Sequence, residues 1–342
     1  MRYPFLLLLP LLLAGGCKPA ESPAPAAAGD RPAMVRPAPH NHQWSPVKTN
    51  GKPTARHEAA FVRVGEKCYL LGGRGIKPVD IYDPTTRTWT SGRPSPVEIH
   101  HFQPVVYNDE IYLMGAMTGP YPGEDPLPDI HIYNPARDEW RTGDAIPEGR
   151  RRGGAGAVLH DGKIYLVCGI SDGHRGDHRS WLDAYDPATG QWEQLPDAPR
   201  PRDHFQAVVA GGKLYALAGR TTVAATNPFA NTIGEVDVYD FKKRNWTTLR
   251  DTLPTHRAGN FAIVPDGEQR ILVAGGESTA QVEAHREVEG LSIRSHTWTK
   301  LPPLSRGRHG TGIVQFGEVL ITASGCGNRG GSPELDDVII GL

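Results

Sequence analysis

Apolar residues in this chain occur in short runs separated by polar turns. In segments 105–115, 157–169 and 208–219, a few apolar residues lead into a polar turn and then into a second apolar run that ends in glycine. An aromatic turn commonly follows, as in the Ile-Tyr-Asp-Pro sequence at 81–84. Runs this short, bounded by turn residues, predict β-strands rather than helices.

The same pattern recurs about every fifty residues, a period typical of repeat architectures. Its clearest marker is a tryptophan, at separations of 45, 51, 52, 54 and 52 residues: Trp44, Trp89, Trp140, Trp192, Trp246 and Trp298. Each unit holds four apolar segments, which is the pattern of a four-stranded antiparallel sheet. Because one such ring buries about 150–250 Å², we expect the tryptophans to be buried between neighbouring sheets.

These repeats resemble the kelch family over residues 42–342, and the resemblance implies an all-β propeller in which each repeat forms one blade around a central channel. Five units are complete, but the sixth begins near Gly307 and reaches Leu342 with three strands and no tryptophan. The segment around Trp44 offers the missing strand. We therefore expect a six-bladed propeller with four antiparallel strands per blade, the last blade being closed by the N-terminal strand.

The composition agrees with a turn-rich β fold and excludes other classes. Gly (40) and Pro (31) are abundant, which disfavours a helical bundle or a doubly wound α/β fold. With 37 Lys and Arg against 38 Asp and Glu, the chain lacks the basic excess of nucleic-acid binders, and none is expected as a partner. Cys68, Cys168 and Cys326 are predicted to be small buried residues, because an odd number argues against a complete disulfide framework.

The N-terminal segment is predicted to be a targeting signal. Residues 1–16 combine a basic start, a short apolar run and small residues before Cys17, and they resemble the lipoprotein signals of bacteria, in which the cysteine is acylated. Lys18 is compatible with an outer-membrane destination, so we expect an exported, lipid-anchored envelope protein with a Pro/Ala-rich linker at 17–41. Ala14 stands where leucine is usual, which leaves an ordinary signal peptide as the alternative.

A recurrent arginine marks the entrance to the first strand of most units. Arginine here belongs to the kelch pattern, and in kelch domains that bind acidic peptides or sialic acid such arginines engage carboxylates. The resemblance therefore makes these residues candidate ligand-binding groups: Arg56, Arg152, Arg202, Arg257 and Arg308. The alternative is that they brace the carbonyl groups of neighbouring loops.

Alignment of these entrances on their β-branched residues places a further set in one column: Glu58, His101, Gly154, His204, Gly259 and His309. The histidines fall on alternate blades. Three neutral imidazoles converging on the propeller axis could hold zinc, copper or iron, with Glu58 nearby as a carboxylate. A polar or acid-binding role and simple loop bracing remain open, and no other cofactor is expected.

Long loops between the second and third strands lie on the same face as these entrances, where binding residues usually reside: residues 115–129, 169–181, 219–235, 275–286 and 325–335. The leading hypothesis is a monomeric binding propeller for a small anionic or carbohydrate-like ligand, or for an acidic protein loop. No P-loop, GxSxG or HExxH motif occurs, and the copper-radical site of galactose oxidase, which has kelch-like blades, cannot be transferred.

An enzymatic function is the alternative hypothesis. Exported bacterial kelch propellers include sialic-acid mutarotases, which are similar to this chain in blade number and signal peptide. That isomerisation needs an acid/base group and an arginine for the sugar carboxylate. Candidate acid/base residues are Glu58, His204 and Glu277, with Arg202 for the carboxylate; metal-dependent chemistry at the histidines is a third hypothesis.

Overall fold

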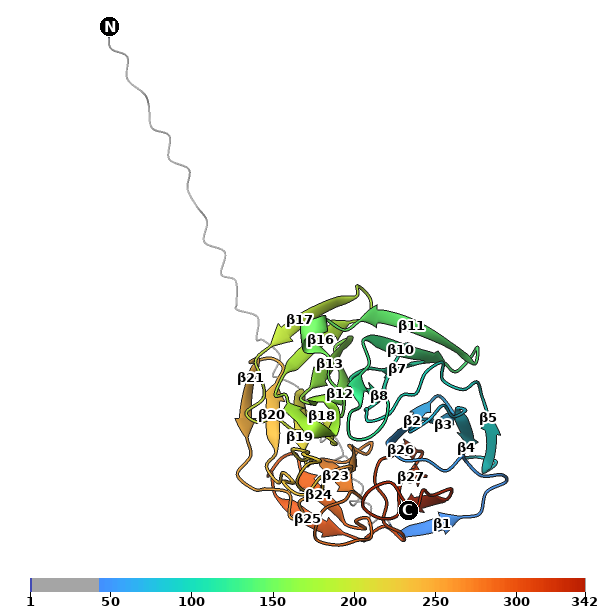
Figure 1. Cartoon of the computed structure of the whole chain (residues 1–342). Coiled ribbons are helices and arrows are strands. Elements are labelled where there is room, and N and C mark those ends of the chain that lie inside the picture. Colours follow the sequence, from blue (N-terminus) through green and yellow to red (C-terminus); the bar gives the residue numbers. More distant parts are fainter. Residues whose placement is uncertain (2–42, 342) are drawn as a thin grey trace, which may run out of the picture. The chain divides into compact units, whose positions relative to one another are not determined.

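The computed structural model describes residue 1 and residues 43–341, and within 43–341 six four-stranded antiparallel sheets are arranged in a ring (Figure 1). Two further two-stranded sheets lie in the loops. The predicted all-β fold, a six-bladed propeller with four strands per blade, is confirmed. In the described part of the chain no helix is long and apolar enough to cross a membrane. Cys17 and the predicted leader and linker lie outside the described residues.

The first three blades follow the predicted strand order from the channel outwards. Blade 1 contains β2 (Ala59–Val64), β3 (Lys67–Gly72), β4 (Asp80–Asp83) and β5 (Thr88–Ser91). Blade 2 contains β6 (Val105–Tyr107), β7 (Glu110–Leu113), β10 (Asp129–Asn134) and β11 (Glu139–Ala145). Blade 3 contains β12 (Gly156–His160), β13 (Lys163–Val167), β16 (Leu182–Asp186) and β17 (Gln191–Leu195).

Blades 4 and 5 repeat this arrangement, and blade 6 takes its outer strand from the start of the domain. Blade 4 contains β18 (Gln206–Ala210), β19 (Lys213–Leu217), β20 (Asp237–Asp240) and β21 (Asn245–Thr248). Blade 5 contains β22 (Phe261–Ile263), β23 (Arg270–Ala274), β24 (Val288–Ser292) and β25 (Trp298–Leu301). Blade 6 contains β26 (Ile313–Phe316), β27 (Val319–Ala323), β28 (Val338–Gly341) and β1 (Trp44–Val47).

The ring is closed by the N-terminal strand, as predicted. Strand β1 pairs antiparallel with β28, so that Trp44 lies opposite Gly341 and Val47 opposite Val338. Pairing protects an edge of blade 6 that would otherwise be open and joins both ends of the domain in one sheet. The Trp44 side chain is buried in the cluster that blades 5 and 6 share.

The remaining tryptophans occupy the outer strands. Each of four stacks on a tyrosine of its own blade with ring centroids 4.8–5.2 Å apart, in the pairs Tyr82–Trp89, Tyr133–Trp140, Tyr185–Trp192 and Tyr239–Trp246. Trp44 and Trp89 are buried, whereas the other repeat tryptophans are half-buried and pack against the clusters between blades. The interblade position is thus confirmed, but burial is complete only near the closure.

Three loop segments add small elements on the face that carries the long loops, here called the loop face. Blade 2 carries the hairpin β8 (Met117–Thr118) and β9 (Asp125–Pro126). Blade 3 carries β14 (Ile170–Asp172) and β15 (Gly176–His178), joined by the single turn η2 (Gly173–Arg175). A second turn, η1 (Glu148–Arg150), precedes blade 3. Cys68, Cys168 and Cys326, the cysteines in the described part of the chain, are buried and free, as predicted.

Candidate functional site

A ring of backbone hydrogen bonds encircles the channel where the chain enters each first strand. One residue per blade adopts a left-handed conformation with φ between 52° and 64°: Glu58, His101, Gly154, His204, Gly259 and Gly310. From blade 2 onward, the N–H of each of these residues donates to the carbonyl of its counterpart in the preceding blade at 2.6–3.1 Å. Ala59 completes the circle by donating to Gly310 at 3.1 Å.

This ring corrects the predicted column of residues. Gly310, not His309, takes the sixth ring position, because Arg308-His309-Gly310 has the same spacing as Arg56-His57-Glu58. The alignment on β-branched residues shifted the sixth unit by one place. His309 therefore does not lie with His101 and His204 on the ring, and the three do not form the predicted metal-binding triad.

The arginines at the strand entrances lie inside the blades. All five are fully buried and ion-paired at 2.5–3.1 Å with a carboxylate beside the third strand of the same blade, in the pairs Arg56–Asp80, Arg152–Asp183, Arg202–Asp237, Arg257–Glu289 and Arg308–Asp337. They also donate to backbone carbonyls, as Arg257 does to Gly275 and Val273. This placement leaves no guanidinium surface for a ligand, so the bracing role replaces the predicted ligand-binding role.

The loop face contains a cavity of about 470 Å³ above the ring. As expected, the long loops form its wall, and they contribute Tyr121, His174, Arg220, Pro228, Phe229, Glu277, Gly330 and Gly331. Blade 1 adds Arg74 and His57, and the ring residues Glu58 and His101 also line it. The volume lies within the range of about 300–1,000 Å³ usual for small-molecule sites.

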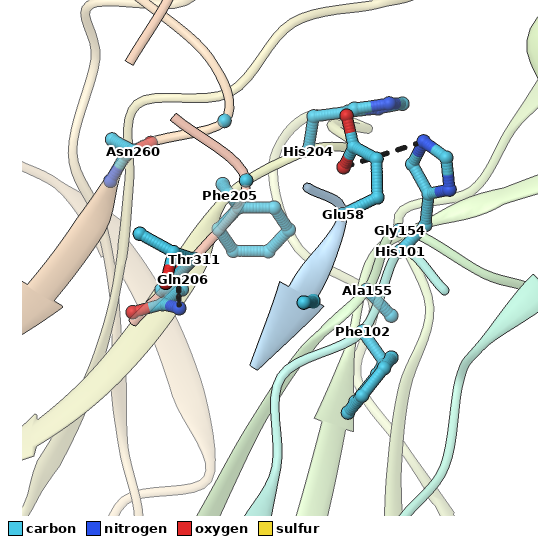
Figure 2. A pocket seen from close by; sticks show the side chains of 13 residues that line it. Glu58, His101, Phe102, Gly154, Ala155, His204, Phe205, Gln206, Asn260 and Thr311 are labelled. Atoms are coloured by element: carbon cyan, nitrogen blue, oxygen red, sulfur yellow. Dashed lines mark hydrogen bonds and ion pairs between the residues drawn. The ribbon is translucent and has the colours of Figure 1, made fainter. Parts of the chain in front are cut away.

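A smaller pocket of about 40 Å³ follows the inner side of the ring. In Figure 2 a dashed line joins the Glu58 carboxylate to the His101 imidazole, and Phe102 and Ala155, which also line this pocket, lie away from that pair. Glu58 Oε2 is 3.4 Å from His101 Nε2. Glu58 and His101 line both spaces, so these two side chains separate the channel from the cavity.

Three histidines converge beside Glu58. His101 and His204 come from the ring, and His174 reaches them from turn η2 of the blade 3 loop. The Nε2 atoms of His174 and His204 are 3.1 Å apart, and the ring centroids of His101 lie 5.0 Å and 4.7 Å from those of His174 and His204. All three side chains are buried.

Each of these imidazoles is hydrogen-bonded through its Nδ1. His204 Nδ1 is hydrogen-bonded to Asp203, His174 Nδ1 lies 2.9 Å from Glu124 Oε2, and His101 Nδ1 lies 2.6 Å from His100 Nδ1. Asp203 is itself fixed by the Thr222 hydroxyl at 2.6 Å, and Glu124 is ion-paired with Arg74. These partners fix the orientations of the rings.

The surroundings determine the charge of these groups. Burial lowers the pKa of His101 well below its usual value, and the neighbouring histidines and Arg74 lower it further, so its ring is neutral. Burial and Arg220 likewise outweigh Asp203 and lower the pKa of His204. Burial would raise the pKa of Glu58, but His204, His57, His309 and Arg220 together lower it to about 2. Glu58 is therefore a carboxylate, 11% exposed, beside a neutral imidazole.

A second charged group lies across the cavity. Glu277 is buried and binds Arg220 through Oε1, while its Oε2 accepts the Gly330 N–H at 2.7 Å and lies 3.4 Å from His309 Nε2. Burial opposes ionisation of Glu277, but His309 and Arg220 lower its pKa. Arg220 also donates to Thr222 and lies over the Phe229 ring.

The structure thus gathers part of the predicted site and adds residues that the sequence did not single out. The candidate acid/base residues Glu58, His204 and Glu277 lie at the cavity or its ring. Arg74 and Arg220 were missed; both follow a glycine that ends a second strand, and that Gly-Arg pair was the available signal. Glu124 and His174 come from loops without the repeat pattern.

Comparison with known proteins agrees with this architecture. The class defined by the fold is the six-bladed kelch-type β-propeller, a binding-module fold. Residues 28–283 match the attractin/LZTR1 β-propeller model, and the chain belongs to this kelch-type propeller family.

Related proteins have different names and lengths. The chain is 28% identical over 335 residues to the kelch-like protein terF of Aspergillus terreus, which covers 92% of this chain and 69% of that protein. It is 25% identical over 282 residues to an N-(sulfonatooxy)prop-2-enimidothioate sulfolyase of Thlaspi arvense, covering 71% and 77%. It spans only 28% of the length of one vertebrate kelch-like relative. The solved structure of YjhT superposes with a TM-score of 0.70 at 17% identity, covering 85% of this chain and 96% of that one.

Proposed function

We propose that the propeller binds a small anionic or carbohydrate-like molecule in the loop-face cavity. The observation that carries this proposal is the cavity of about 470 Å³, whose wall combines guanidinium, carboxylate and aromatic groups from loops of all six blades. A pocket of this size fits a small molecule better than an acidic protein segment, which would need an extended groove.

Arg220 lines the cavity and can meet an anionic group there, although its side chain is only 2% exposed before a ligand binds. Its Nε and Nη1 bind Thr222 and Glu277, and within the described residues its Nη2 makes no hydrogen bond. The Phe229 ring lies 5.7 Å from the guanidinium carbon and offers an apolar surface next to it. A planar cation beside an aromatic face suits a carboxylate carried on a sugar-like ring.

A panel of small anions tests this proposal. We expect N-acetylneuraminate, glucuronate or a small dicarboxylate to raise the melting temperature, since binding to the native state stabilises it by mass action. Arg220→Gln should weaken the binding found by calorimetry at least about tenfold, because a hydrogen bond to a charged group contributes roughly 1.5–3 kcal/mol. Arg141→Gln, at an exposed pair with Glu110, is the matched control. Absence of stabilisation by every compound contradicts the proposal.

A second candidate function is isomerisation of a carbohydrate. It is favoured by the Glu58 carboxylate, which lies 3.4 Å from the neutral His101 imidazole at the cavity floor. A carboxylate next to an imidazole can exchange a proton with an anomeric hydroxyl. Exchange NMR on freshly dissolved N-acetylneuraminate would measure anomer interconversion, and a rate equal to that of Glu58→Gln would rule this function out.

We also propose that the chain is anchored through Cys17 in the cell envelope of a bacterium, at the outer membrane. The support is the signal-like sequence of residues 1–16 alone. Metabolic labelling with a fatty-acid analogue should modify the full chain but not Cys17→Ser. Equal labelling of both proteins would refute the anchor, and fractionation of the labelled protein would identify its membrane.

A further inference from the structure

We propose that His101, His174 and His204 bind one transition-metal ion through their Nε2 atoms at the floor of the loop-face cavity. Among the described residues, these are the one group of His, Cys, Asp or Glu side chains whose candidate ligand atoms all lie within 4.8 Å of one another. The proposed site contains His174 in place of His309 of the triad predicted from the sequence. This inference does not depend on which molecule binds in the cavity.

The tautomers of His174 and His204 leave two lone pairs facing each other. Each Nδ1 is hydrogen-bonded to a carboxylate, Glu124 or Asp203, which only accepts, so each Nδ1 must carry the proton of its ring. A neutral imidazole has one such proton, and both Nε2 atoms are then bare. Two bare nitrogens 3.1 Å apart repel unless a proton or a metal ion lies between them.

The imidazole of His101 also presents a lone pair, on its Nε2, towards the Nε2 atoms of His174 and His204. His100 Nε2 lies 3.2 Å from the Gly119 carbonyl and must donate to it, which leaves His100 Nδ1 as an acceptor. His101 Nδ1 therefore donates to His100 Nδ1 at 2.6 Å, and His101 Nε2 is bare. This buried Nε2 atom has no hydrogen-bond partner.

The spacing of His174 and His204 suits a first-row metal ion, and the three ligand atoms together lie within 4.8 Å of one another. Two nitrogens bound at about 2.0–2.1 Å in a tetrahedral site are separated by about 3.3 Å, close to the His174–His204 separation. The Glu58 carboxylate, 3.4 Å from His101 Nε2, can supply a fourth ligand or hold a bound water. Two acceptors at this distance again require a proton or a metal ion between them.

The donor set defines the class of metal. Three imidazole nitrogens favour zinc, copper, nickel or iron over magnesium and calcium, which prefer oxygen ligands. The carboxylates behind His174 and His204 are the partners that orient histidine ligands in metal sites. A bound ion could polarise a carbonyl or hydroxyl oxygen of a ligand in the cavity, since the floor of the cavity includes His101.

Metal content and titration test this inference. The full chain, purified without a polyhistidine tag or chelator, should contain close to one equivalent of a transition metal by elemental analysis. After chelation, Zn²⁺ and Co²⁺ should rebind with a stoichiometry of one, and Co²⁺ should give the visible absorption of a nitrogen-ligated ion. Less than about a tenth of an equivalent, together with no rebinding of Zn²⁺, Co²⁺ or Cu²⁺, overturns the inference.

Variants locate the ion. His174→Ala should lower the affinity for Zn²⁺ more than Glu124→Gln, for which the loss typical of an outer partner is about 10–100-fold. His131→Gln, at a buried histidine of β10 outside the cluster, should bind Zn²⁺ like the unmodified chain. Circular dichroism verifies folding of each variant. Binding that survives both His174→Ala and His204→Ala would contradict the site even if the protein contains metal.

Discussion

Arg202 and His204 lie two residues apart at the entrance of blade 4 and are both buried, yet their polar atoms face different groups. Arg202 is neutralised within its own blade by Asp237, and its terminal nitrogens donate to backbone carbonyls, although its Nε has no hydrogen-bond partner. His204 is held by Asp203 on one side only, and its Nε2 faces that of His174. Arg202 therefore stabilises its own blade, whereas His204 leaves its Nε2 available to bind a ligand or a metal ion.

The same contrast holds around the ring. The arginine recurs in five blades and always finds a carboxylate, which is the behaviour of a structural element. The ring position varies: three blades place glycine there, and three place Glu58, His101 or His204 in a left-handed conformation that disfavours side chains. The arginine position, which is the same in five blades, stabilises the scaffold. The ring position, which differs between blades and has a left-handed backbone, provides residues of the candidate site.

Removing a blade arginine is the change from which we expect the largest effect. Arg257→Ala leaves Glu289 buried without its cation and frees the carbonyls of Gly275 and Val273. Loss of one partner of a buried pair costs about 3–5 kcal/mol, so urea unfolding should show a destabilisation of this size. Metal binding at the histidine cluster should persist in the fraction that remains folded.

An exposed ion pair provides the control for this experiment. Arg141→Ala breaks a pair with Glu110 in which the arginine side chain is 49% exposed, and such pairs typically contribute 0–1 kcal/mol. If Arg257→Ala were as mild as Arg141→Ala, the bracing role would be wrong, and the arginines would again be candidates for ligand recognition.

The sequence predicted the scaffold well because its determinants are local. Turn residues, alternating apolar runs and one tryptophan per unit recur in every blade, and the missing tryptophan of the sixth unit pointed to β1. The arginine was found as well, but its partner was not. The carboxylate lies about 24–35 residues downstream, as Asp80 does for Arg56 and Asp237 for Arg202, and repeat spacing does not show which side chains point inward.

The site was predicted only in part because it depends on contacts between blades. Glu58, His101 and His204 were found from their shared place in the repeat. His174 and Glu124 come from irregular loops of different blades, and no periodic signal brings them together. His309 was misplaced because β-branched residues were used to set the register, whereas the left-handed residue sets it in the structure.

A pH-dependent contribution of His309 is expected to be the next largest effect. Burial would lower the pKa of His309, but Glu277, a hydrogen bond with Cys326 and Glu58 raise it to about 9. A folded-state pKa above the unfolded value of about 6.5 stabilises the protein at low pH, and the contribution is lost as the pH rises through about 9. At about 1.4 kcal/mol per unit of pKa, its upper bound is about 3–4 kcal/mol.

Unfolding of His309→Gln at several pH values measures this contribution. The variant should be less stable than the unmodified chain at pH 6, and the difference should shrink towards pH 9.5. His160→Gln, at a half-buried histidine of β12, is the control. A difference that is constant with pH would show that His309 acts through packing rather than through its charge beside Glu277.

The smallest effect concerns the glycines that occupy ring positions. Both Gly154 and Gly310 have φ near 60°, where a side chain costs roughly 1–2 kcal/mol. A Cβ on Gly154 would meet its nearest atom at 3.4 Å, so Gly154→Ala should cost only about 1 kcal/mol in urea unfolding. A Cβ on Gly310 would lie 2.7 Å from the Glu58 backbone nitrogen, and Gly310→Ala should cost more. Equal costs would contradict the ring geometry, because only at Gly310 does the neighbouring blade exclude a side chain, whereas blade 3 has room for one beside the histidines.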